Sequence, residues 1–163
     1  MSDRDVLDVS AVDDPSESAV PMVIAICCLT IILALMLGVG LATKLVLRHL
    51  VQTAPLWIGV ALGFRRSSAS AWATLPLFLF WVILMAVIWS YLLGFSQLLS
   101  GSFSRVETAM TVIVGTASVI GIASFARFKS SLSGLIAGAW FVIMGIIQFA
   151  CFRISFLPSM AHH

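Results

Sequence analysis

Four long apolar runs occupy most of this chain, and nearly all charged residues lie between or outside them. An apolar run of about 20 residues is about 30 Å long as a helix, which matches the hydrocarbon core of a bilayer. A soluble domain has about 45–50% apolar and about 25% charged residues, whereas this chain has 61% and 10%. The sequence therefore predicts an all-α membrane protein with four transmembrane helices in a small bundle.

The four predicted spans cover about residues 19–43, 71–95, 106–126 and 131–152. Together they form one membrane domain over residues 19–153, which leaves no room for a separate soluble enzyme domain. Residues 1–18 are acidic and show no helical or alternating periodicity, as is typical of a short disordered tail. Residues 154–163 are expected to form a short C-terminal tail. No secretory signal is expected, because the first apolar run is too long and follows a negative segment.

The stretch between the first two spans is less regular. Polar side chains interrupt its beginning, over residues 48–52, and Pro55 is expected to break a continuous helix. The remaining apolar part, about residues 55–64, would be about 15 Å long as a helix, which is half the hydrocarbon thickness. We therefore expect a short interfacial or re-entrant helix here. The alternative is a fifth span over residues 45–64, which would reverse the orientation of everything after it.

Basic and aromatic residues suggest how the chain is anchored and oriented. Trp57 is expected at headgroup level, with Arg65 and Arg66 in the aqueous layer beside lipid phosphates. Counting Lys and Arg in the alternate loops of four spans gives six on one side and three on the other. The positive-inside rule places the richer side in the cytoplasm. We expect a bacterial inner (plasma) membrane protein with both termini outside the cytoplasm.

The start of the third span carries a helix-capping pattern. Ser104 and Glu107 have the Ser-x-x-Glu spacing of a capping box, in which each side chain bonds the other residue's backbone N–H. Glu107 is the only acidic residue after the N-terminal segment. The capping role gives a sufficient local reason for its presence, so we do not assign it a catalytic role.

Small residues at helical spacing mark the faces on which membrane helices approach closely. In the third and fourth spans, the helix-packing candidates are Gly115, Ala117, Gly121, Gly134, Gly138 and Gly145. We expect these two spans to pack tightly as antiparallel neighbours. Gln148 is expected to face protein, because an unpaired amide in hydrocarbon is costly. Its expected partners lie in the third span, at Thr111, Ser118 or Ser124.

No catalytic, metal-binding or cofactor-binding site is predicted. No ionisable side chain is expected at mid-depth of a span, where coupled transporters generally keep one. His49 is expected in a loop, and the adjacent His162 and His163 make a poor metal chelate. The basic residues are too few and too dispersed for nucleic-acid binding. We therefore expect no enzyme activity, no cofactor and no nucleic-acid partner.

Elimination leaves three functional hypotheses. The leading one is an accessory or assembly subunit of a larger membrane complex, which acts through its lipid-facing surface. The alternative is a small homo-oligomeric transporter or channel, with a path lined by Thr108, Thr111, Ser118 and Gln148. A weaker alternative is a membrane thiol redox protein that uses the three cysteines Cys27, Cys28 and Cys151. The expected partners are the lipid bilayer and either a larger complex or further copies of the chain.

Overall fold

The computed structural model describes residues 15–95 and 103–157, with no side chains described for residues 15–18. Most of the predicted acidic tail and most of the predicted C-terminal tail lie outside these ranges. Helix α1 (Pro15–Leu33) begins within the segment that we predicted to be a tail. The described part of the chain is helical and contains no strand.

The first apolar run forms one continuous helix of three parts. Helix α1 leads into a seven-residue π-helix, η1 (Ala34–Gly40), and then into the short α2 (Leu41–Thr43). A π-helix holds extra residues in a turn and widens the helix locally. The helix ends at Lys44, which adopts a left-handed conformation with φ of 58°.

Three further apolar helices follow, and their bounds lie within three residues of the predicted ones. They are α4 (Ser70–Leu92), α5 (Arg105–Phe125) and α6 (Gly134–Ile154). With the run Ala19–Thr43, the described residues contain four helices long and apolar enough to cross a membrane. The predicted fold class, an all-α bundle with four such helices, is confirmed.

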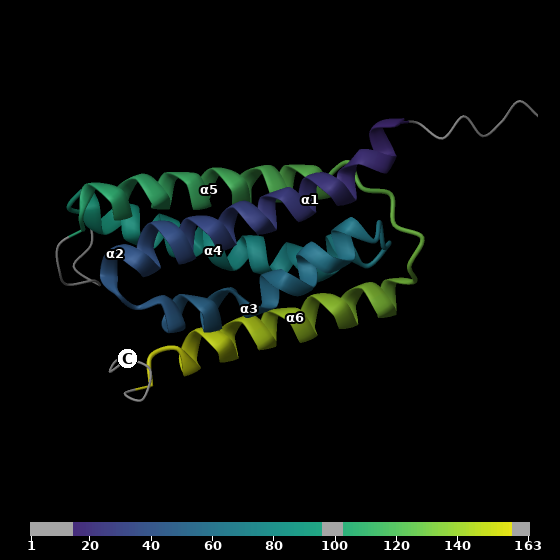
Figure 1. The fold of residues 1–163 in the computed structure, drawn as a ribbon. Coiled ribbons are helices and arrows are strands. Elements are labelled where there is room, and N and C mark those ends of the chain that lie inside the picture. Colours follow the sequence, from purple (N-terminus) through teal and green to yellow (C-terminus); the bar gives the residue numbers. More distant parts are fainter. Residues whose placement is uncertain (1–14, 96–102, 158–163) are drawn as a thin grey trace, which may run out of the picture.

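The segment between the first two apolar helices differs from its prediction. Instead of a short helix over about residues 55–64, the structure has one 19-residue helix, α3 (Val46–Phe64), with Pro55 inside it. Proline lacks an N–H and disturbs the preceding turn, which can bend a helix without ending it. Figure 1 shows α3 changing direction near its middle. A 19-residue helix is about 28 Å long, close to the thickness of a bilayer core.

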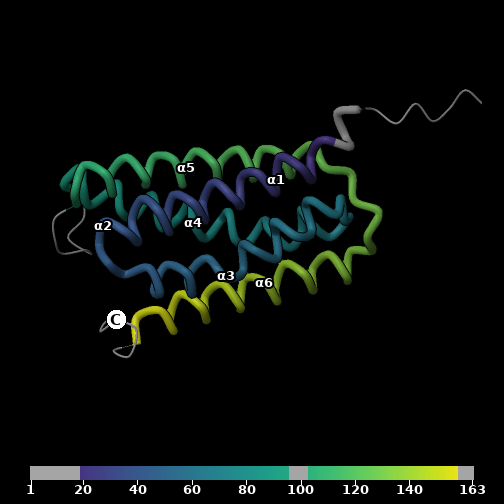
Figure 2. The backbone as a smooth tube through the Cα atoms, in the orientation of Figure 1, coloured from purple at the N-terminus to yellow at the C-terminus, as the bar shows by residue number. Residues whose placement is uncertain are grey.

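Short links hold α3 between its neighbours in the chain. Only Lys44 and Leu45 connect it to the first helix at one end of the bundle, and residues 65–69 connect it to α4 at the other end. Helix α3 therefore runs antiparallel to both neighbours, alongside the four apolar helices (Figure 2). It packs against α1, η1, α4 and α6.

The prediction that the third and fourth apolar helices pack tightly on each other is wrong. Helix α5 packs against α1 and α4, whereas α6 packs against α4 and α3, so the two lie on opposite sides of the bundle (Figure 1). The reason is α3, which supplies a surface for α6 that an arrangement of four helices lacks. With α3 included, α1 begins and α6 ends at opposite ends of the bundle (Figure 1).

Close backbone contacts join α3 to its neighbours near its C-terminal end. A Cβ added at Gly63 would lie 2.6 Å from the backbone oxygen of Pro21. One added at Gly59 would lie 2.6 Å from Thr74 Cγ2 and 2.9 Å from Cys28 Sγ. No larger side chain fits at either glycine without moving the helices apart.

The predicted helix-packing residues have different surroundings. On α5, Gly121 lies directly against the ring of Phe78 and Gly115 faces Met85, while on α6 Gly145 faces Pro76, so all three glycines face α4. Ala117 is buried. A Cβ at Gly134 or Gly138 would meet nothing within 4 Å. The Gly-xxx-Gly pair of α6 therefore makes no close contact within the described protomer.

Candidate functional site

The predicted anchoring arginines and the capping residues lie at the ends of helices, whereas Trp57 lies seven residues before the end of α3, about 10 Å from it along the axis. Trp57 is exposed on α3, and Arg65 and Arg66 are exposed in the turn after it. At the start of α5, the N–H of Ser104 donates to Glu107 Oε2 at 2.7 Å, and the N–H of Glu107 donates to Ser104 Oγ at 3.2 Å. The structure thus contains the capping box that the sequence predicted.

A cavity of about 390 Å³ lies at the end of the bundle where α3 begins. Parts of six elements surround it: η1, α2, the first turns of α3, the later part of α4, the first half of α5 and the end of α6. Its polar lining residues are Thr43, Arg48, His49, Gln52, Glu107 and Thr111. Its apolar lining includes Leu35, Val39, Trp81, Met85, Val114 and Phe152.

Arg48 and His49, in the first turn of α3, form the most polar side of this cavity. The guanidinium carbon of Arg48 lies 3.8 Å from the centre of the Phe156 ring, a cation–π contact that orients the side chain. Arg48 Nε and His49 Nδ1 are buried and have no hydrogen-bond partner among the described residues. Arg48 is half-buried and forms no ion pair with a described acidic side chain, so its guanidinium lies at the mouth of the cavity without a carboxylate partner.

Glu107 contributes the only acidic side chain among the cavity-lining residues. One of its oxygens already accepts a bond from the backbone of Ser104, and its charge lies at the positive N-terminal end of α5. His49 lines the same cavity as Glu107 and Arg48. The cavity therefore combines one guanidinium without a partner, one engaged carboxylate and an imidazole.

The residues that line this cavity become less polar from the end of the bundle toward its middle. Arg48 and Glu107 lie in the first turns of their helices, whereas Val114 is seven residues after Glu107, about 10 Å further along the axis of α5. The deep residues Val114 and Trp81 are 0% and 1% exposed. Trp81 Nε1 is buried without a described partner, so one unpaired donor lies at the apolar end as well.

Hydrogen bonds between α3 and α6 explain why α3 tolerates Gln52 inside the bundle. Gln52 Nε2 donates to Ser155 Oγ at 2.9 Å, and Gln148 Nε2 donates to the backbone oxygen of Gln52 at 3.1 Å. Gln148 is 0% exposed, which confirms that it faces protein. The predicted partners on α5 are wrong, because α6 packs on α3 instead.

Sequence reasoning missed this site because it assigned His49 to a loop and excluded ionisable groups from the bundle. The missed signal is the periodicity of α3: Gln52, Leu56, Gly59 and Gly63 recur at helical spacing and are all buried. A polar residue in register with a small and apolar stripe indicates a buried helix that carries polar groups inward. Reading Pro55 as a helix breaker concealed this pattern.

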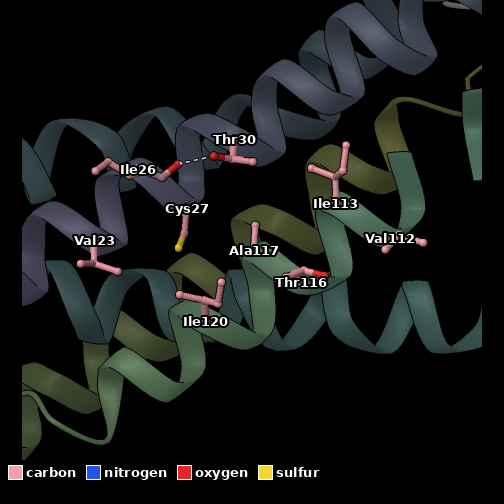
Figure 3. Close-up of a pocket in the computed structure, with 9 residues that line it drawn as sticks. All are labelled: Val23, Ile26, Cys27, Thr30, Val112, Ile113, Thr116, Ala117 and Ile120. Carbon is pink, nitrogen blue, oxygen red and sulfur yellow. Dashed lines mark hydrogen bonds between the residues drawn. The ribbon is translucent and has the colours of Figure 1, made fainter. Parts of the chain in front are cut away.

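A second hollow, of about 450 Å³, lies between α1 and α5 and is almost wholly apolar (Figure 3). Its one hydroxyl from α1, that of Thr30 in the last turn of this helix, donates to the backbone oxygen of Ile26 at 2.9 Å. Cys27 points into this hollow, near Ala117 and Ile120 of α5 (Figure 3). Such a groove suits lipid chains, and apart from the hydroxyl of Thr116 it offers little polarity to specify a ligand.

The residues of the two alternative hypotheses do not gather in one place. All three cysteines are free, and Cys151, near the end of α6, is distant along the bundle axis from the start of α1 (Figure 1). Ser118 is 0% exposed and donates to the backbone oxygen of Val114 at 2.7 Å. Gln148 is also buried. Two of the four residues predicted to line a solute path therefore lie inside the protomer and not on a surface between protomers.

Comparison with known proteins gives no further assignment. No protein-family model, no curated protein and no solved structure matches this chain. Within the described residues, no group of three or more His, Cys, Asp or Glu side chains could hold a metal ion. The fold and the apolar helices define the class as a small all-α membrane protein, and the cavity is its most specific site.

Proposed function

We propose that this protein binds a small amphipathic molecule in the cavity between α3, α4 and α5. One observation carries the proposal: the cavity is polar at the first turns of α3 and α5 and apolar toward the bundle middle. Its volume of about 390 Å³ lies within the range of small-molecule pockets, which is about 300–1,000 Å³. An amphipathic molecule in a bilayer is oriented in the same way, with its polar group near the interface and its apolar part at depth.

The proposed role is binding without autonomous catalysis. General acid–base or nucleophilic chemistry needs groups within hydrogen-bond reach of one another and of a reacting atom. In the described part of this cavity, the carboxylate of Glu107 is engaged in the capping box and Arg48 lies on an aromatic ring. Because both side chains are already engaged, the cavity is better suited to binding a ligand than to catalysing a reaction of it.

We further propose that α3 crosses the membrane as a fifth helix, so that the two termini lie on opposite sides. Its length, its antiparallel links and its burial among the apolar helices support this arrangement. The basic residues on the two sides are then nearly balanced, with five on the side where α1 begins (Arg4, Arg65, Arg66, Arg127 and Lys129) and four on the other (Lys44, Arg48, Arg105 and Arg153). The positive-inside rule therefore gives no orientation. The proposed location remains the inner (plasma) membrane, where helical spans are the rule.

Ligand retention tests the proposed binding. The protein would be isolated from membranes in mild detergent, and co-purified small amphiphiles would be counted by native mass spectrometry. Ile88 lines the cavity from α4, and Ile83 on the same helix is 63% exposed. We expect Ile88→Trp to fill the cavity and remove a stoichiometric amphiphile, and Ile83→Trp to retain it. Equal retention by both variants would contradict the proposal.

A second candidate function, that of an accessory subunit, is favoured by α6. Gly134 and Gly138 meet nothing within the protomer, and the neighbouring Leu135 is 84% exposed. In lipid, a small-xxx-small face allows the backbone of another helix to approach closely. The proposed occupant is one transmembrane helix of a different subunit with small residues at matching spacing.

Mass measurement of the detergent-solubilised complex tests this second role. A constant larger partner that is lost on Gly138→Leu supports it, because leucine would block the close approach. A second copy of this chain in place of a different subunit, or a monomer throughout, would contradict it. Gly145→Leu is not a suitable control, since Gly145 faces Pro76 inside the protomer.

A further inference from the structure

We infer that the ligand of this cavity is an anionic amphiphile, whose acidic head group binds Arg48 and whose acyl chain extends toward Trp81. This inference rests on the proposed binding function and names the chemical class of the ligand. The acidic head can be a phosphate, as in an anionic phospholipid, or a carboxylate, as in a fatty acid. Both present oxygen acceptors with negative charge to the same donors.

The first argument is the uncompensated charge of Arg48. Arg48 is half-buried, and its Nε–H is the part of the guanidinium that has left water. A buried donor of a charged group is costly unless an anion or another acceptor replaces its hydration. Here the guanidinium stacks on Phe156, which orients it, but its Nε–H has no described acceptor. Arginine is suited to planar, bidentate binding of carboxylate or phosphate oxygens.

The second argument is that the unpaired atoms of the cavity lining can all donate. Arg48 Nε and Trp81 Nε1 are donors only, and His49 Nδ1 is a donor in the protonated ring or one of its two neutral tautomers. Trp81 is 1% exposed, so water does not reach it freely. A ligand that supplies acceptors near Arg48 and deeper, such as the ester oxygens below a lipid phosphate, would pair with both tryptophan and arginine.

The third argument concerns Glu107, the one negative group that faces the cavity. Its Oε2 is bonded to the Ser104 N–H at 2.7 Å, and its charge is offset by the N-terminus of α5. Glutamine at this position preserves a capping box and removes the charge. Glu107→Gln therefore distinguishes an anionic ligand from a zwitterionic one, whose cation would need the carboxylate.

The test uses the full chain in neutral detergent with defined amphiphiles, and native mass spectrometry to measure the bound fraction. The probes are a phosphatidylglycerol, oleate, and a phosphatidylcholine with the same chains as the phosphatidylglycerol. We expect one of the two anionic probes to bind at least tenfold more tightly than phosphatidylcholine, and the better one identifies the head group. Equal binding of all three would overturn the anionic assignment.

Two matched arginine variants distinguish specific binding in the cavity from nonspecific electrostatic attraction of an anion to the protein. We expect Arg48→Gln to weaken binding of the anionic probe at least tenfold, because glutamine cannot form the charge-assisted hydrogen bonds of the guanidinium. Arg65→Gln removes the same charge from an exposed position at the other end of the bundle and is expected to leave binding unchanged. Equal losses in both variants would overturn the inference, as would weaker binding in Glu107→Gln.

The outcomes also separate this inference from the proposed function. Amphiphile binding that Ile88→Trp abolishes but Arg48→Gln leaves intact would keep the cavity as a binding site and refute its anion specificity. Binding that neither variant affects would refute both. Circular dichroism and the thermal midpoint of each variant show whether a loss reflects a misfolded bundle.

Discussion

The contact between α1 and α3 is tightly packed at one end, whereas at the other end the first helix and α3 are separated by a cavity. At the closed end, which we define by Pro21 and Cys28 of the first helix and Gly59 and Gly63 of α3, glycines let the helices approach closely. At the open end, where η1 faces the first turns of α3, the same two helices border the cavity. The polar groups of α3 are found only on the open side. Close packing holds the pair together at one end and leaves the other end available for a ligand.

The largest expected effect comes from breaking the closed end. Gly63→Leu would force a side chain into the backbone of Pro21, a contact that no rotamer change can relieve. We expect a loss of about 3 kcal/mol or a failure to accumulate folded protein. Thermal unfolding in detergent measures it. The matched control is Gly138→Leu on α6, measured on the isolated chain, in which the added side chain meets nothing within 4 Å. Equal destabilisation by both variants would contradict the comparison.

A smaller effect should distinguish the adjacent thiols of α1. Cys27 faces the apolar groove toward α5, whereas Cys28 Sγ lies near Gly59 and is 0% exposed. Reaction of Cys28 requires the closed end to open, so we expect N-phenylmaleimide to modify Cys27 at least tenfold faster. Peptide mass spectrometry over a time course gives both rates. Comparable rates would show that the closed end opens freely.

The capping box should have a moderate effect on the open end. Ser104→Ala removes the acceptor for the Glu107 N–H and is expected to lower stability by about 1 kcal/mol. Ser104→Asp supplies another capping oxygen and should recover most of the loss. Thermal unfolding of the three proteins checks this. A fully stable Ser104→Ala variant would indicate that the first turn of α5 depends on other contacts.

The smallest expected effect is the coupling between Gln52 and Ser155. Their side-chain hydrogen bond joins α3 to α6 beside the cavity. Polar pairs between membrane helices contribute about 0.6 kcal/mol on average and up to about 1.7. A double-mutant cycle of Gln52→Ala and Ser155→Ala measures this coupling free energy. A coupling of zero would mean that packing alone positions α3 against α6.

The sequence was most informative where a helix faces lipid. The bounds of α4, α5 and α6 follow from long apolar runs between polar residues, and the cap at Ser104 follows from a local pattern. Helix α3 was misread because hydropathy averages over a segment and cannot show that Gln52 finds a partner on α6. The site could not be predicted, because it depends on which helices are neighbours and Arg48 lies 59 residues from Glu107 along the chain.

The central claim is that α3 crosses the membrane and carries polar groups into the bundle. The most direct test is the location of the two termini, measured by attaching the same small epitope to either end. Antibody access would be compared in sealed vesicles of one orientation, before and after permeabilisation. The account predicts that one terminus is accessible without permeabilisation and the other only after it. Two termini with the same accessibility would contradict it.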